Sequence, residues 1–147
     1  MNLIDALLGE HGAFNALFET VEEMGSIGGD LAKIESATAV LTAEVDSHAV
    51  LEEELLFPLL QPHLGTSPLI DEMLAEHNEI RMGLEWMEDA RDINEAVKAA
   101  KDTVAVARRH FEKEENLVYA VAQQMLDDET LDQLGKDWAA ARHVKIA

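Results

Sequence analysis

The sequence contains no cysteine among its 147 residues. Disulfide bonds, zinc sites with cysteine ligands and iron–sulfur clusters are therefore excluded, although this absence says little about the cellular compartment. Basic residues are also scarce, because 11 lysines and arginines stand against 30 aspartates and glutamates, for a formal net charge of −19. We expect most of this charge to form a solvated surface that repels phosphate backbones and anionic membranes, so the sequence predicts no nucleic-acid partner and no membrane partner.

Long hydrophobic runs are missing as well. A membrane-spanning helix needs roughly 18 consecutive apolar residues, and the longest candidate here covers only residues 55–60 and contains Pro58. The first residues include Asp5 and Glu10 but lack the basic segment that opens a secretory signal peptide. We therefore expect a cytoplasmic protein.

Helical periodicity dominates the chain, and three segments rich in glycine, proline or polar residues interrupt it. We expect helices over about residues 2–24, 31–60, 68–91 and 93–125, and a shorter one over about 129–142. Asp30 and Ser67 are expected N-caps, and Asp92 with Glu95 has the spacing of a capping box. Pro58 is expected to kink or end the second helix, because proline lacks an amide hydrogen.

Long helices joined by short connections pack as antiparallel neighbours. The sequence therefore predicts an all-α fold, an up-down-up-down antiparallel four-helix bundle over about residues 2–125 with a short C-terminal helix. A length of 147 residues fits a single domain over 1–147.

Polar residues interrupt the apolar stripe of every long helix. Each stripe contains one histidine in a position where the core expects an apolar side chain. The second and fourth helices also carry a glutamate one turn after the histidine. The interrupting residues are His11, His48, Glu52, His77, His110 and Glu114.

The joint pattern favours a metal site over isolated polar residues. Burying an ionised carboxylate costs several kcal/mol unless it is paired or bound to metal. Taken singly, each histidine is explained by a core hydrogen bond and each His-x-x-x-Glu by a surface pair. Four histidines that fall at similar depths in the two predicted hairpins instead indicate convergence on two metal ions about 3.5–4 Å apart.

Helix geometry selects the bridging glutamates. A residue four positions after a histidine returns to nearly the same helix face, so Glu52 and Glu114 are expected to bridge the two ions. By the same argument, Glu10 and Glu76 are expected to face away from the site, and Glu53, Glu54, Glu112 and Glu115 are expected to lie in solvent. His63, in the loop after the second helix, and His143, near the C-terminus, are expected to be structural or solvent-facing.

These six residues, with the stretches at residues 52–58 and 110–115, give the chain a resemblance to the hemerythrin-like (HHE cation-binding) family over about residues 3–125. Oxygen-carrying hemerythrins have a further histidine four residues after the third-helix ligand, where this chain has Arg81. They also use a later aspartate on the fourth helix, where this chain has Glu114. The chain therefore looks closer to bacterial hemerythrin-like proteins associated with peroxide, nitric oxide or iron handling.

The resemblance implies a non-haem di-iron centre with an oxo or hydroxo bridge, with zinc or manganese as possible substitutes. It favours a protein that binds or turns over a small oxidant, namely peroxide, O2 or NO, and catalase- or peroxidase-like activity is one form this could take. A protein that only stores, senses or carries O2, NO or iron is the alternative, and a bundle without metal is a third.

Two further residues have candidate roles beside the metal site. Arg81 could bond a bound anion or a bridging carboxylate, or it could extend to the surface. Tyr119 follows Glu114 by five residues and could serve as a hydrogen donor or redox-active group, or simply pack in the core. The sequence leaves the substrate, the redox partner and the oligomeric state open.

Overall fold

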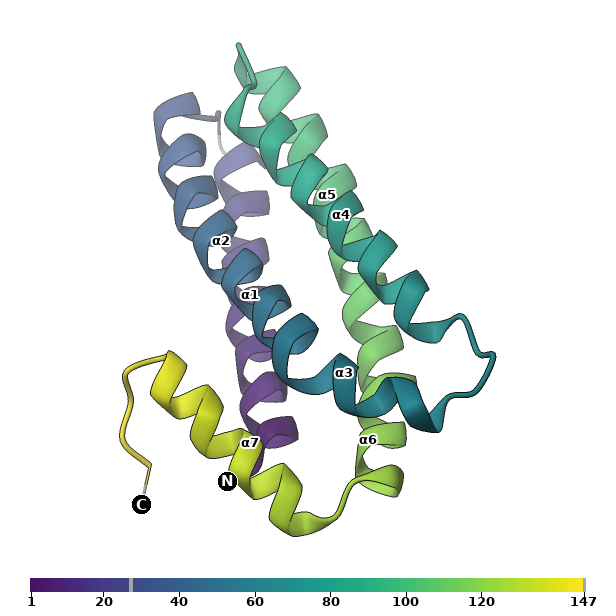
Figure 1. Ribbon diagram of the computed structural model, residues 1–147. Coiled ribbons are helices and arrows are strands. Elements are labelled where there is room, and N and C mark those ends of the chain that lie inside the picture. Colours follow the sequence, from purple (N-terminus) through teal and green to yellow (C-terminus); the bar gives the residue numbers. More distant parts are fainter. Residues whose placement is uncertain (27, 147) are drawn as a thin grey trace.

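A computed structural model describes residues 1–26 and 28–146, and this described part contains helices and no strand. The four long helices α1 (Leu3–Ser26), α2 (Leu31–Leu51), α4 (Leu69–Glu88) and α5 (Ile93–Lys113) run up, down, up and down (Figure 1). The predicted all-α four-helix bundle is therefore confirmed.

Two of the long helices continue through a π-helical turn into a further short helix. Helix α2 leads through η1 (Glu52–Leu56) into α3 (Phe57–Leu60) and the 3₁₀ turn η2 (Gln61–His63). Helix α5 leads through η3 (Glu114–Val118) into α6 (Tyr119–Met125). The sequence predicted uninterrupted helices here and missed both π-helical turns.

In each π-helical turn the backbone hydrogen bond reaches one residue further along the chain than it does in an α-helix. The amide of Phe57 bonds the carbonyl of Glu52, and the amide of Tyr119 bonds the carbonyl of Glu114, so each bond spans five residues. Pro58 does not end the helix, because it occupies the first turn of α3, where a missing amide hydrogen costs little. Insertions of this kind are frequent at functional sites.

The predicted helix starts are largely correct. Asp30 accepts a hydrogen bond from the amide of Ala32, and Asp92 accepts one from the amide of Glu95 at 2.9 Å. Ser67 was expected to cap α4, but the cap position falls on Pro68. Helix α4 also ends at Glu88, three residues before the predicted end at residue 91.

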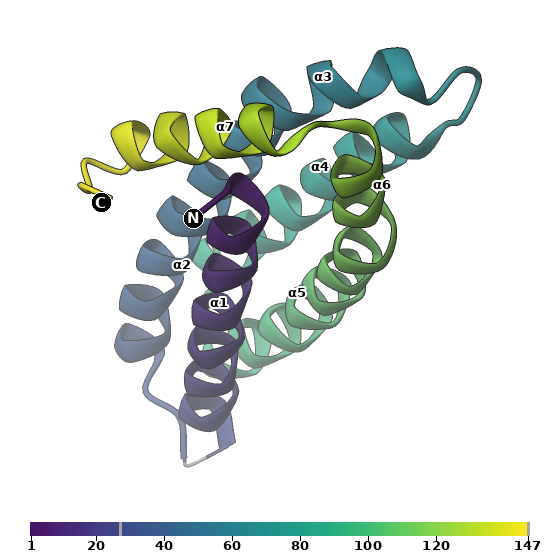
Figure 2. The same cartoon turned by 90° about the horizontal axis from the view of Figure 1, so that it is seen from below.

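The C-terminal helix α7 (Asp128–Ala141) crosses the end of the bundle where the chain begins, beside α1 (Figure 2). Asp127 caps it by accepting a hydrogen bond from the amide of Thr130. Among the residues that the structure describes, no helix combines the length and the apolar character that a membrane crossing requires.

The apolar core is divided into two clusters with a polar layer between them. In α1, Leu7 belongs to the cluster near α7 and Phe14 to the other, and His11 lies between them. In α4, Met73 and Ile80 flank His77 in the same way. Apolar side chains therefore cover the polar layer on both sides and keep it in a low-dielectric environment.

Candidate metal centre

All six predicted ligands lie in this polar layer, and each has an exposed fraction of 3% or less. Each of the four long helices contributes one histidine. The two glutamates are the first residues of the two π-helical turns, η1 and η3. The structure therefore brings together His11, His48, Glu52, His77, His110 and Glu114.

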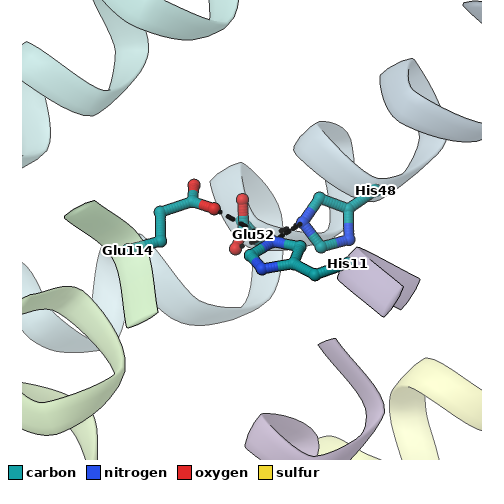
Figure 3. Close-up of side chains that lie close together, drawn as sticks. All are labelled: His11, His48, Glu52 and Glu114. Carbon is teal, nitrogen blue, oxygen red and sulfur yellow. Dashed lines mark hydrogen bonds and ion pairs between the residues drawn. The ribbon is translucent and has the colours of Figure 1, made fainter. Parts of the chain in front are cut away.

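Their ligand atoms form two overlapping groups. His11 and His48 make one group with Glu52 and Glu114, and His77 and His110 make the other with the same two glutamates. Within each group one donor atom from every residue lies within 4.8 Å of the others. Figure 3 shows the first group, in which both imidazoles point toward the carboxylates. Two metal positions that share two bridging carboxylates fit this arrangement.

The four inward nitrogens are the Nε2 atoms. Nε2 of His11 lies 3.2 Å from Nε2 of His48 and 3.2 Å from Oε2 of Glu114. Nε2 of His77 lies 3.3 Å from both Glu52 and Glu114. The closest packing is between Nε2 of His110 and Oε1 of Glu114, at 2.7 Å.

Several of these buried atoms have no hydrogen-bond partner in the structure. They are Oε2 of Glu52, Oε2 of Glu114 and Nε2 of His110, whose short approach to Glu114 lacks hydrogen-bond geometry. An unsatisfied buried polar atom costs about 1–3 kcal/mol, and more when it is charged. Imidazole nitrogen and carboxylate oxygen are ligands for iron, zinc and manganese, so the donor set fits a bound cation.

The outward Nδ1 atoms of all four histidines contact glutamates. Nδ1 of His48 lies 2.7 Å from Glu10, and Nδ1 of His110 lies 2.7 Å from Glu76. These two glutamates were expected to face away, and that expectation is wrong. They lie on the face of their helix that meets the neighbouring helix.

The remaining two histidines have the same type of partner. Nδ1 of His77 lies 2.8 Å from Glu53, and Nδ1 of His11 lies 2.9 Å from Glu115. Both glutamates were expected to lie in solvent. Glu115 is exposed as expected, whereas Glu53 is half-buried, and the contacts of both carboxylates with histidines were not predicted. Exposed positions are confirmed for the rest of that set: Glu54, His63, Glu112 and His143.

These four outer contacts form a closed ring around the bundle. Glu10 of α1 contacts His48 of α2, and Glu53, just after α2, contacts His77 of α4. Glu76 of α4 contacts His110 of α5, and Glu115, just after α5, contacts His11 of α1. In a neutral histidine a carboxylate on Nδ1 fixes the tautomer, so that Nε2 would present its lone pair to a bound metal. The sequence does contain a signal for this ring, because each outer glutamate is the immediate neighbour of one of the six inward residues.

Three of the outer glutamates are themselves held by other side chains. Arg142 and Trp138 donate to Glu10, and Lys113 donates to Glu76. Arg81 donates to Glu53 at 3.0 Å and to Asp46 at 2.7 Å.

Arg81 is thus placed in the outer part of the site. Its guanidinium bonds Glu53, the partner of His77, and the structure gives it no bond to Glu52 or Glu114. Burial lowers the pKa of Arg81, but the hydrogen bonds to Asp46 and Glu53 outweigh burial and raise it, so the group stays charged.

Tyr119 lies directly at the polar layer and is 2% exposed. Its hydroxyl donates to Oε1 of Glu52 at 2.6 Å and lies 3.2 Å from Nε2 of His11. Burial raises the pKa of Tyr119 well above its ordinary value, and the charges of Glu52 and Glu114 raise it further. The phenol therefore keeps its proton at neutral pH.

The carboxylates also control the charge of the histidines in the metal-free site. Burial lowers the pKa of His48, but Glu52 and Glu10 outweigh burial and raise it to about 10. Burial likewise lowers the pKa of His77, while Glu114 and Glu52 raise it to about 10. A metal ion must displace these protons, so metal binding is coupled to proton release.

A cavity of about 10 Å³ borders the site. That volume holds about one water molecule. Its lining combines three of the histidines with apolar side chains and the Arg81–Asp46 pair: Val45, Asp46, His48, Ala49, His77, Ile80, Arg81, His110 and Phe111.

Comparison with known proteins assigns the family. A DNA nickase of Nostoc sp. is 25% identical over 146 residues, which cover 97% of this chain and 39% of the nickase, so the chain spans well under half of that relative. No solved structure matches at a significant level. The family described as the hemerythrin HHE cation binding domain matches residues 2–122, which include all six inward residues. The chain therefore belongs to the hemerythrin HHE cation-binding domain family.

Proposed function

We propose that this protein is a non-haem di-iron protein that binds or turns over a small oxidant, namely peroxide, O2 or NO. The observation that carries the proposal is the pair of overlapping ligand groups that share Glu52 and Glu114. Two carboxylates common to both groups suit two neighbouring cations better than one. Imidazole and carboxylate together suit iron, with zinc and manganese as substitutes.

Bound iron would supply reversible electron transfer to or from the oxidant. Each metal position would have two imidazoles and two shared carboxylate oxygens, which leaves room for a small ligand at both. The cavity beside His48, His77 and His110, at about 10 Å³, favours a ligand of two or a few atoms. Larger organic substrates would need the surrounding side chains to move.

The protein's own groups would handle protons near that ligand. The hydroxyl of Tyr119 donates to Glu52 and lies beside His11, so it could donate instead to an anionic ligand next to Glu52. Arg81 lines the cavity and carries a permanent charge, which would favour an anion there. We infer that Tyr119 serves as a proton donor and that Arg81 acts mainly through Glu53.

Peroxide dismutation is the most specific form of the proposal. Two molecules of H2O2 give one O2 and two H2O, so the reaction balances without a further reductant. The alternative is binding, sensing or storage of O2, NO or iron without turnover. It is favoured by the coverage of only 39% of a longer relative, because a binding domain joined to another activity would match in this way.

The DNA-nicking activity named for that relative is not carried over to this chain. A net charge of −19 opposes contact with a phosphate backbone. The aligned region of this chain contains all six inward residues, so we infer that the similarity reflects a shared domain and not a shared nicking activity.

The test is peroxide decay by protein loaded with two equivalents of iron, compared with metal-free and zinc-loaded protein. We expect iron-dependent O2 release at half the rate of peroxide loss. Tyr119→Phe should slow this reaction by roughly 10²-fold if the phenol donates a proton. An O2 or NO adduct in the optical spectrum without peroxide loss would instead favour the binding protein.

A further inference from the structure

Helix α7 lies outside residues 2–122, the segment that matches the family, yet its Trp138 and its C-cap residue Arg142 reach the metal centre through the side chain of Glu10. Helix α7 packs closely against the start of α1. A Cβ atom added to Gly135 would lie 2.5 Å from the carbonyl oxygen of Met1, so only glycine permits this approach. Figure 2 shows α7 beside the N-terminal end of α1.

Two donors of this C-terminal segment hold the same oxygen of Glu10. Nε1 of Trp138 donates to Oε1 at 3.1 Å, and Nε of Arg142 donates to Oε1 at 2.7 Å. Arg142 also donates to the hydroxyl of Ser47, the residue before His48. The second oxygen of Glu10, Oε2, is left to accept from Nδ1 of His48 at 2.7 Å.

The two oxygens of Glu10 therefore face different partners. Fixing one oxygen reduces the rotational freedom of the carboxylate, and so aims the other at the imidazole.

We propose that α7 positions His48 for metal binding through Trp138, Arg142 and Glu10, so that docking of α7 and metal binding at the His11–His48 position stabilise each other. This inference rests on the proposed two-metal function. It makes Trp138 and Arg142 positioning residues, because neither contacts a ligand nitrogen or a bridging carboxylate. By thermodynamic linkage the effect must run in both directions.

The effect should be confined to one of the two metal positions. The outer glutamates of His77 and His110 are held by Arg81 and Lys113, which belong to α4 and α5. No residue of α7 is among the described partners of those two glutamates. Loosening α7 should therefore weaken the His11–His48 position and leave the His77–His110 position unchanged.

The experiment first isolates each metal position by removing one histidine of the other position, and then changes the residues that link α7 to Glu10. His77→Ala leaves the His11–His48 position complete, and His11→Ala leaves the His77–His110 position complete. Anaerobic cobalt(II) titration against a competing chelator gives the affinity of the remaining position in each background. Arg142→Ala should weaken cobalt binding about tenfold in the His77→Ala protein and not in the His11→Ala protein.

Matched variants distinguish positioning from loss of fold. Trp138→Phe keeps the ring and removes only the N–H donor, so it should give a smaller loss in the same background. Arg142→Lys should restore part of the affinity, and Lys145→Ala, on an exposed residue of the same segment, should have no effect. Circular dichroism checks that each variant remains helical.

The reverse direction has its own readout in the wild-type protein. Hydrogen exchange of the α7 amides should slow on metal binding by more than that of the exposed start of α4. Wild-type protein that fails to bind two equivalents of metal would overturn the proposed function itself. Two equivalents in the wild type, with equal affinities before and after Arg142→Ala in both backgrounds, would overturn only the role of α7.

Discussion

The hairpin of α1 and α2 and the hairpin of α4 and α5 build the two halves of the centre from the same parts. Each supplies two histidines, and each second helix supplies a shared glutamate at the start of a π-helical turn. The halves differ in what surrounds them. The first depends on α7 through Glu10, whereas the second is held by Arg81 and Lys113 from its own helices.

A second difference lies one π-helical turn after each shared glutamate. Phe57 follows Glu52 by five residues, and its ring stacks on that of His77 with centroids 5.6 Å apart. Tyr119 follows Glu114 by five residues, and its hydroxyl bonds Glu52. The comparison teaches that the ligand set can be nearly symmetric while proton supply and outer support are not.

The largest expected effect comes from removing what the halves share. Glu114→Ala should abolish binding at both positions, because Glu114 belongs to both ligand groups. Its charge also matters, since burial raises the pKa of Glu114 but its close contacts with His11, His110 and His77 lower it well below its ordinary value. Metal analysis should give less than one equivalent. Glu54→Ala, on an exposed neighbour of the other shared glutamate, is the control and should keep both equivalents.

The next effect concerns pH and should involve both halves equally. The pKa of His48 and that of His77 are raised to about 10 in the metal-free fold, from an unfolded value near 6.5. The stability that this contributes is fully present below pH 6.5 and is lost as pH rises through about 10.

Chemical denaturation of metal-free protein should therefore show a midpoint that falls between pH 6.5 and about 10. Metal-loaded protein should lack this fall, because its ligands are already neutral. His48→Gln and His77→Gln should each remove part of it. A midpoint that rises with pH in metal-free protein would contradict the assignment.

Replacing one outer glutamate should weaken metal binding at one of the two positions only. Glu53→Ala should weaken the His77–His110 position by about 10–100-fold, and Glu10→Ala should weaken the His11–His48 position to a similar extent. Chelator competition measures both. Loss of both equivalents in either variant would mean that the halves are not independently supported.

The smallest expected effect is that of Arg81. Its side chain is 28% exposed, so its ion pairs with Asp46 and Glu53 are partly screened and contribute about 1 kcal/mol or less. Arg81→Ala should therefore weaken the His77–His110 position only severalfold. Arg81→His with a new optical spectrum would show that position 81 reaches the metal, contrary to the contacts seen here.

The sequence was sufficient for the helices and the six inward residues, because both follow from helical periodicity and the cost of buried charge. The sequence did not predict which helix faces point inward after the shared glutamates Glu52 and Glu114. A regular helix would put Leu59, seven residues after Glu52, on the same inward face, but Leu59 is 39% exposed while Leu56 and Leu60 are buried. The π-helical turn rotates the following face by one residue, and no local signal for it was recognised.

The outer ring was missed for a different reason. Periodicity within one helix assigns a side chain to a face, but it does not show which neighbouring helix meets that face. Glu10 and Glu76 lie beside inward histidines, yet their carboxylates reach the histidine of the next helix. Such contacts depend on helix packing, which a single helix does not reveal.

The most direct test of the two-metal account is a crystal structure of iron-loaded protein with anomalous scattering measured at the iron edge. Two peaks are expected in the polar layer, one beside His11 and His48 and the other beside His77 and His110, with Glu52 and Glu114 contacting both. A single peak in this layer, or iron found only on the acidic surface, would contradict the account.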